Sequence, residues 1–207
     1  MSDTGSTATE TVCSLIDGVA ARAVSSFMAV LANIWNLFAG APASAPRRRE
    51  RVLPAPPTSY SVRPLTEKSS RDVLRLNLRC FRNGENYTKY TFAYLFNEPK
   101  ALSYQAVTGD GKMAAYMFVI VQEDGTAHLT TIGVAPEHRR RGVAEMMLGH
   151  LETVLRAKGV STIVLEVRVH NVPAQTLYVR NGYITVKRIA KYYTDGEDCF
   201  MMLKSLH

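Results

Sequence analysis

Residues 132–144 run Ile132-Gly133-Val134-Ala135-Pro136-Glu137-His138-Arg139-Arg140-Arg141-Gly142-Val143-Ala144, where an apolar run gives way to a basic turn and then to a helical pattern. The run before Pro136 predicts a strand. A helix is expected beyond Gly142, because apolar residues recur there at helical spacing: Val143, Met147, Leu148, Leu151, Val154 and Leu155. A helix start offers unpaired N–H groups and a positive dipole end, and small residues at Gly142 and Ala144 let an anion approach. The stretch predicts a phosphate-binding turn; the alternative is an ordinary turn with solvated arginines.

The pattern Arg139-x-x-Gly142-x-Ala144 resembles the acetyl-CoA loop of the GNAT superfamily of N-acetyltransferases. The resemblance implies the GNAT fold, a central mixed, mostly antiparallel twisted sheet flanked by helices, with acetyl-CoA as cosubstrate and no metal. It assigns cofactor binding to nine residues: Ile132, Gly133, Val134, Arg139, Arg140, Arg141, Gly142, Val143 and Ala144. It also implies that the strand ending at Val134 splays from its neighbour, and that the Val134 N–H donates to the acetyl carbonyl.

A second block downstream comprises Leu165-Glu166-Val167-Arg168, then Asn171, Leu177-Tyr178 and Asn181-Gly182-Tyr183. It resembles the corresponding segment of the bacterial ribosomal-protein alanine N-acetyltransferases and their N-terminal acetyltransferase relatives. The resemblance extends from about residue 113 to residue 203, and loosely back to residue 61. It implies that Glu166 is the general base and Tyr178 the general acid, with Asn171 hydrogen-bonded to the pantetheine arm.

The chemistry of acetyl transfer asks for such groups independently. An α-amine is mostly protonated at neutral pH and must lose a proton to attack a thioester, while a phenol can donate a proton to the departing thiolate. The alternatives are structural: Glu166 could form a salt bridge with a neighbouring strand, with Arg168 on the same face as its possible partner, and Tyr178 could fill the core. On the preceding strand, His128 is the titratable competitor for the role of base, although a lone strand histidine is more often structural.

The segment Tyr192-Tyr193-Thr194-Asp195-Gly196-Glu197-Asp198 resembles the tyrosine pair and acidic turn of peptide N-terminal acetyltransferases. The resemblance implies that Tyr192 and Tyr193 bind the acceptor; an ordinary hairpin turn at Asp195-Gly196 is the other interpretation. The stretch from Cys80 to Tyr87 lacks the Phe-Pro turn of those relatives, so the acceptor stays open. We expect acetyl transfer to a protein or peptide N-terminal α-amine, of ribosomal-protein type. The alternatives are a small-molecule amine acetyltransferase and a docked acetyl-CoA-binding module with little turnover.

The pattern over residues 60–207 predicts one mixed α/β domain, because strands and helices follow one another without strict alternation. Expected strands cover residues 61–63, 102–107, 114–121, 127–134, 162–169, 183–192 and 199–203. Expected helices cover residues 69–81, 87–96, 142–158 and 172–181.

Residues 1–41 predict a separate amphipathic helical extension, and residues 42–59 a Pro- and Arg-rich linker. From Val12 to Phe38 the apolar residues follow one helical stripe. We expect an interfacial or docking helix, which would associate the protein with a membrane surface or a ribosome. A single membrane span, anchored by the arginines of residues 47–51, is disfavoured by the Asn and Ser residues within the run. A signal peptide is disfavoured by acidic residues in its long leading segment.

The chain carries a net charge of +7, with 25 Lys and Arg against 18 Asp and Glu. Most of this charge lies beyond residue 60, which suits a nucleotide ligand or an acidic surface, or simply solubility. No sequence-specific binding of nucleic acid is expected. The chain has an odd number of cysteines, and they are widely spaced: Cys13, Cys80 and Cys199. This pattern indicates neither a disulfide framework nor a zinc site, so the cytoplasm is the expected compartment.

Overall fold

The computed structural model describes residues 52–81 and 87–207. The helix expected over residues 12–38 and most of the expected linker lie outside this part of the chain. The elements follow in this order: β1 (Tyr60–Pro64), the 3-10 helix η1 (Glu67–Ser69), α2 (Ser70–Cys80), α3 (Lys89–Asn97), β2 (Ala101–Thr108), β3 (Met113–Val121), β4 (Thr126–Val134), the 3-10 helix η2 (Pro136–His138), α4 (Val143–Ala157), β5 (Thr162–Arg168), α5 (Val172–Arg180), β6 (Ile184–Ile189) and β7 (Cys199–Ser205).

The strands of the described residues form one seven-stranded sheet in the order β1-β2-β3-β4-β5-β7-β6. Every neighbouring pair is antiparallel except β4 and β5, which run parallel. Parallel neighbours need a crossover connection, and α4 supplies it. The predicted mixed, mostly antiparallel sheet is therefore confirmed, with four α-helices in the described part of the chain.

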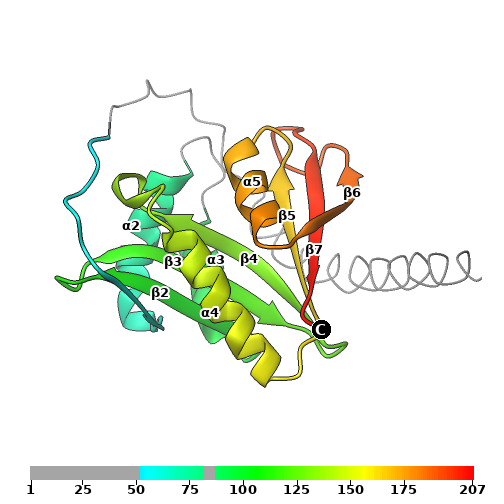
Figure 1. The fold of residues 1–207 in the computed structure, drawn as a ribbon, viewed down its shortest axis with the longest axis horizontal. Coiled ribbons are helices and arrows are strands. Elements are labelled where there is room, and N and C mark those ends of the chain that lie inside the picture. The colour runs from blue at the N-terminus through cyan, green and yellow to red at the C-terminus, as the bar shows by residue number, and fades with distance from the viewer. Residues whose placement is uncertain (1–51, 82–86) are drawn as a thin grey trace, which may run out of the picture. The chain divides into compact units, whose positions relative to one another are not determined.

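Helices cover both faces of the sheet (Figure 1). On β3, Ala115 and Met117 belong to the core that contains the apolar stripe of α4. The alternating residues Tyr116 and Phe118 contact Phe92 of α3, with ring centroids 5.9 and 5.6 Å away. Because successive strand residues point to opposite faces, α4 covers one face and α3 the other.

The element boundaries agree with the sequence-based expectation to within a few residues, with one larger difference. The strand expected over residues 183–192 is shorter, since β6 ends at Ile189. Lys191 adopts a φ of +50°, which breaks the extended backbone, and the Tyr193 N–H then donates to the Glu197 carbonyl within a turn. Tyr192 and Tyr193 consequently lie in a loop between β6 and β7.

Within residues 52–81 and 87–207, no helix combines the length and the apolar character needed to cross a membrane.

Candidate active site

The parallel strands β4 and β5 pair over three residues each and then separate. Their register joins Thr126–His128 to Thr162–Val164 and, within the described structure, extends no further toward the C-terminal ends of the two strands. Figure 1 shows the strands together at one end of the sheet and apart at the other. At Thr130 the register of β4 against β3 also shifts by one residue, so β4 bends as it leaves β5. The structure thus contains the expected splay, a wedge between β4 and β5.

The peptide groups of Val134 face this wedge. Ala135 donates its N–H to the carbonyl of Ala114, near the start of β3, over 2.8 Å. Successive residues of a strand direct their backbone polar groups to opposite edges, so those of Val134 are directed toward β5. Its carbonyl accepts hydrogen bonds from Cys80 Sγ at 3.3 Å and from Arg139 Nε at 3.1 Å. The Val134 N–H therefore lies on the edge where an oxyanion donor would be needed.

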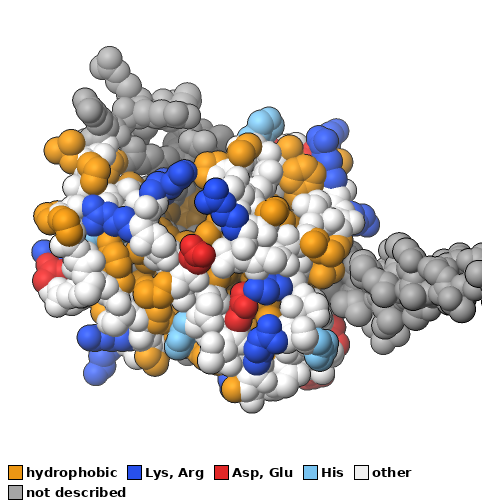
Figure 2. Space-filling model, in the orientation of Figure 1, with side chains coloured by type: hydrophobic (Ala, Val, Ile, Leu, Met, Phe, Trp, Pro, Cys, Tyr) orange, Lys and Arg blue, Asp and Glu red, His pale blue; other side chains and the backbone are white. Residues whose placement is uncertain are grey.

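Gly142 begins α4 in a left-handed conformation, with a φ of +73°. Such a backbone favours glycine, because a Cβ atom strains it. A Cβ atom built on Gly142 would meet no other atom within 4 Å, so the first turn of α4 faces open space. Figure 2 shows a recess between α4 and α5 on this side, flanked by Lys and Arg side chains. The open N-terminal turn of a fifteen-residue helix beside basic side chains fits a pyrophosphate.

The three arginines before Gly142 have different surroundings. Arg139 contacts the Val134 carbonyl and donates from Nη2 to the Cys80 carbonyl over 3.4 Å. Arg141 donates to the Ala55 and Pro56 carbonyls, the latter over 2.9 Å. Both guanidinium groups thus hold backbone segments, whereas the exposed Arg140, with a φ of +61°, extends from the turn itself. Their predicted contacts with the cofactor, like those of Val143 and Ala144, stay predictions.

Glu166 and His128 meet across the wedge. Leu165 and Val167 belong to the core under α4, so Glu166, which alternates with them on β5, points to the opposite face. Its Oε2 lies 2.9 Å from Nε2 of His128 on β4, and the two side chains are 7 and 8% exposed. The other oxygen, Oε1, is buried and has no hydrogen-bond partner among the described residues. A buried carboxylate oxygen without a partner is costly, and an amine or a water would satisfy it.

Three tyrosines lie close enough to Glu166 for its negative charge to act on their hydroxyl groups. Burial, and then the negative charge of Glu166, raises the pKa of Tyr178 on α5 and likewise that of Tyr87 before α3. Burial and the same charge also raise the pKa of Tyr192 in the β6–β7 loop. Tyr87 is fixed by a hydrogen bond from its hydroxyl to the Thr130 carbonyl at the bulge. Because Tyr178 belongs to the core under α4, it approaches the wedge from the face opposite to Glu166.

The structure brings together some of the residues that the sequence predicted and adds others. Glu166, Tyr178, Val134 and Tyr192 all border the wedge, whereas Asn171 caps α5 by accepting from the Ala174 N–H over 3.3 Å. The structural alternative for Glu166, a salt bridge with a neighbouring strand, agrees with its contact with His128 on β4, but the suggested partner Arg168 pairs with Asp195 and Glu197 instead. His128, expected to be structural, is the direct partner of Glu166, and Tyr87 is a further lining residue that no local pattern predicted.

Residues 70–183, which make up more than half of the chain, match the acetyltransferase (GNAT) family. The chain belongs to the GNAT family. It is therefore an N-acetyltransferase, and membership of the family implies acetyl-CoA as the GNAT cosubstrate.

Relatives of this GNAT chain carry the names of N-acetyltransferases. The ribosomal protein bS18-alanine N-acetyltransferase of Escherichia coli is 39% identical over 121 residues, covering 56% of this chain and 78% of that protein. N-alpha-acetyltransferase 30 of Schizosaccharomyces pombe is 27% identical over 146 residues, covering 68% of this chain and 94% of the relative. A crystal structure of the ribosomal-protein-S18-alanine N-acetyltransferase from Escherichia coli superposes with a TM-score of 0.66 at 30% identity, covering 72% and 94% of the two chains.

Proposed function

We propose that this GNAT enzyme acetylates the N-terminal α-amine of a protein or peptide, with Glu166 as the base and Tyr178 as the acid. The observation that carries the proposal is Oε1 of Glu166, which is buried beside the wedge between β4 and β5 and has no hydrogen-bond partner in the part of the chain that the structure describes. An α-ammonium group is a hydrogen-bond donor of the right charge for that oxygen. The named relatives add support for the class of acceptor.

The cosubstrate supplies an activated acetyl group as a thioester. The fold offers it the first turn of α4 for its pyrophosphate and the peptide edge of Val134 for its acyl end. In this arrangement the amine arrives from the Glu166 face of the sheet and the sulfur lies toward Tyr178. The Val134 N–H then donates to the acetyl oxygen, where negative charge develops during attack.

The protons can be followed through the reaction. Oε1 of Glu166 takes one proton from the α-ammonium group, directly or through one water, and the freed nitrogen attacks the carbonyl carbon. A C–N bond forms and the C–S bond breaks, while the sulfur takes the hydroxyl proton of Tyr178. The second amine proton then restores the Tyr178 phenol through solvent, so one proton is released overall. His128 holds Oε2 of Glu166 and so directs Oε1 toward the amine.

The β6–β7 loop, which carries Tyr192 and Tyr193, favours a peptide as the acceptor and not a free small amine. Tyr192 and Tyr193 pack edge to face, with ring centroids 5.1 Å apart, and form an aromatic wall beside Glu166. Such a wall suits the first residues of an extended chain, which present apolar side chains and backbone groups. A small-molecule amine is the second candidate, favoured by the absent Phe-Pro turn between Cys80 and Tyr87.

The test is a turnover screen of the full-length protein with acetyl-CoA over peptides with different N-terminal residues, the same peptides with blocked N-termini, and polyamines. We expect free thiol release with unblocked peptides, and mass spectrometry should place the acetyl group on the α-nitrogen. Faster turnover of a polyamine than of any peptide would contradict the proposed acceptor. Binding of acetyl-CoA without turnover of any amine would instead identify a docked binding module.

A further inference from the structure

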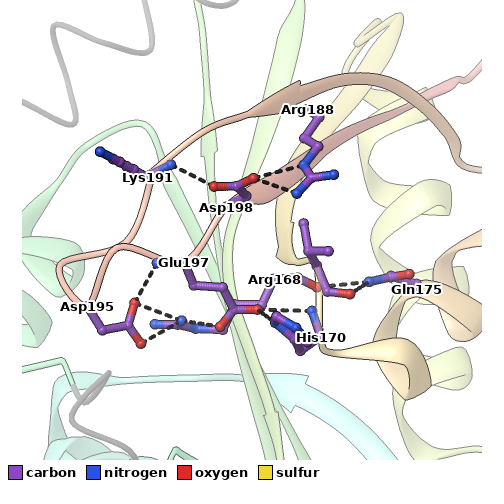
Figure 3. Close-up of polar contacts among 9 residues, drawn as sticks. Arg168, His170, Gln175, Arg188, Lys191, Asp195, Glu197 and Asp198 are labelled. Carbon is purple, nitrogen blue, oxygen red and sulfur yellow. Dashed lines mark hydrogen bonds and ion pairs between the residues drawn. The ribbon is translucent and has the colours of Figure 1, made fainter.

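Arg168 joins the end of β5 to the loop between β6 and β7 (Figure 3). Its Nη1 lies 2.9 Å from Oδ2 of Asp195 and 2.5 Å from Oε2 of Glu197. Glu197 also accepts from the backbone N–H of His170 over 2.9 Å, and its own N–H donates to Oδ1 of Asp195 over 3.0 Å. The carbonyl of Arg168 accepts in turn from Nε2 of Gln175 on α5 over 2.9 Å. Through its guanidinium group and its backbone carbonyl, Arg168 thus connects a strand, a turn and a helix.

The guanidinium group also supports the tyrosine pair directly. Its central carbon lies 3.8 Å from the ring centroid of Tyr193, which is a cation–π contact. Tyr193 and Tyr192 are in edge-to-face contact, and Tyr192 is near enough to Glu166 for the charge of that carboxylate to raise its pKa, after burial. Contacts therefore run from Arg168 through Tyr193 to Tyr192, which stands beside the reacting groups.

Strand alternation explains why this arginine serves the active site. Arg168 follows Glu166 by two residues on β5, so both side chains leave the same face of the sheet. The Arg168 side chain contacts Tyr193, Asp195 and Glu197, so the β6–β7 loop lies on that face. Because Arg168 and Glu166 share β5, the contacts of Arg168 can hold the β6–β7 loop at a defined position relative to Glu166.

We propose that Arg168 is a positioning residue for the acceptor, because it holds the loop of Tyr192 and Tyr193 over Glu166. The inference rests on the proposed function, since it takes these tyrosines as the wall of the acceptor site. It assigns Arg168 no contact with the cosubstrate, because the pyrophosphate turn lies between β4 and α4.

The charges explain why an arginine occupies this position. The Arg168 side chain is 10% exposed and faces two carboxylates, so its removal leaves Asp195 and Glu197 close together without the guanidinium group that binds both. Partial burial pushes the pKa of Glu197 upward, but hydrogen bonds from His170 and Arg168 outweigh it and leave this pKa below its ordinary value. A planar guanidinium can bind both carboxylates and stack on a ring at once, whereas the lysine ammonium acts as a point charge.

The experiment compares steady-state kinetics of Arg168→Gln, Arg168→Lys and a matched control, Arg188→Gln. The control also removes an ion pair to this loop, since Arg188 Nη2 lies 2.7 Å from Oδ2 of Asp198, but this pair is at the surface. We expect Arg168→Gln to raise the KM for the acceptor peptide about tenfold or more, with the KM for acetyl-CoA unchanged. Arg168→Lys should recover part of the loss, and Arg188→Gln should resemble the wild type.

Hydrogen exchange gives a readout that does not depend on turnover. In Arg168→Gln the amides of Tyr193 and Glu197, which are hydrogen-bonded within the loop, should exchange faster, while those of β4 and α4 keep their protection. Unchanged exchange in this loop would show that Arg168 does not hold the loop and would overturn the proposal, whatever the activity of the variant. An equal rise in both KM values would assign Arg168 a general structural role and also contradict the proposal. If the wild type acetylated no peptide while the loop amides still exchanged faster in Arg168→Gln, the proposed function would fail. Arg168 would then hold the loop, but not for a peptide acceptor.

Discussion

Nε2 of His128 lies 2.9 Å from Oε2 of Glu166, which leaves Oε1 of Glu166 as the oxygen available to a substrate. The two residues come from adjacent strands at the point where those strands part. One oxygen is thus used to orient the carboxylate and the other is presented to the wedge. Glu166 is therefore expected to act as the base and His128 to orient it, so mutations of the two residues should affect catalysis to different extents.

Replacing Glu166 should affect catalysis more than replacing His128. Glu166→Gln keeps the size of the side chain but removes the base, so kcat should fall on the order of 100-fold or more. His128→Asn keeps the base and removes only its support, so a smaller loss, about tenfold, is expected. Calorimetry should find the acetyl-CoA affinity near the wild-type value in both. Full activity in Glu166→Gln, or a larger loss in His128→Asn, would reassign the base.

Tyr178→Phe, which removes the hydroxyl, should lower kcat on the order of 100-fold, because the thiolate loses its proton donor. Tyr183→Phe is the matched control: its ring lies 5.6 Å from that of Tyr178, and its buried hydroxyl has no hydrogen-bond partner among the described residues. That control should keep normal turnover and stability, since removing an unsatisfied hydroxyl costs little. Equal activities of the two variants would exclude Tyr178 as the acid.

The pH dependence of kcat offers a second check on Tyr178. Burial, followed by the Glu166 charge, raises the pKa of this phenol above its ordinary value of 10.0. A raised pKa keeps the acid form present to higher pH, so kcat should show no alkaline decline from this group up to about pH 10. A decline near neutral pH that disappears in Tyr178→Phe would show that the phenol ionises early and would contradict the assignment.

The sequence predicted local features well because their signals are local. The turn at residues 139–144 follows from small residues at a helix start, and Gly142 indeed has the positive φ that favours glycine. The contact of His128 with Glu166 could not be foreseen, because it depends on the register of two strands separated by a crossover helix. The hydrogen bonds from Arg141 to the carbonyls of Ala55 and Pro56 could not be foreseen either, because these residues are far away in sequence, and the contact of Arg141 with the cofactor stays a prediction.

Gly142→Val should weaken acetyl-CoA binding about tenfold or more, because valine disfavours the φ of +73° that directs the first N–H groups of α4. Arg140→Ala should have a much smaller effect, since it removes an exposed charge and leaves the turn unchanged. Calorimetric titration with acetyl-CoA measures both, and circular dichroism checks that each variant folds. Unchanged affinity in a folded Gly142→Val protein would remove the turn from the binding site.

Gly133→Ala should destabilise the fold by about 1–3 kcal/mol, because overpacking a core forces its neighbours to move. The new Cβ atom would lie 2.6 Å from Cε1 of Tyr116, a fully buried ring whose hydroxyl donates to Oδ1 of Asn77 over 2.9 Å. Gly149→Ala is the control, since its Cβ atom meets nothing within 4 Å and alanine favours the helix. Urea unfolding should therefore shift in opposite directions for the two variants, and a neutral Gly133→Ala would show that the ring can yield.

The last prediction concerns the boundary between the N-terminal extension and the enzyme. The Ala55 N–H donates to the Glu137 carbonyl over 3.0 Å, and Arg141 binds the carbonyls of Ala55 and Pro56. The end of the expected linker is thus attached to the turn before α4. A deletion that spares these contacts and one that removes them should therefore behave differently.

We propose that residues 1–51 form a docking arm and that residues 52–58 belong to the enzyme. Deletion of residues 1–51 should leave turnover on a free peptide and thermal stability unchanged. It should abolish sedimentation with phosphatidylserine vesicles, because the arginines of residues 47–51 each add about 1 kcal/mol near an anionic surface. Deletion of residues 1–57 should in addition cost about 1–2 kcal/mol of stability, since Arg141 loses its acceptors. Vesicles of phosphatidylcholine alone are the control for charge. If the shorter deletion already unfolds the protein or stops turnover, the arm is part of the catalytic fold; if it still sediments with the anionic vesicles, the membrane contact lies elsewhere.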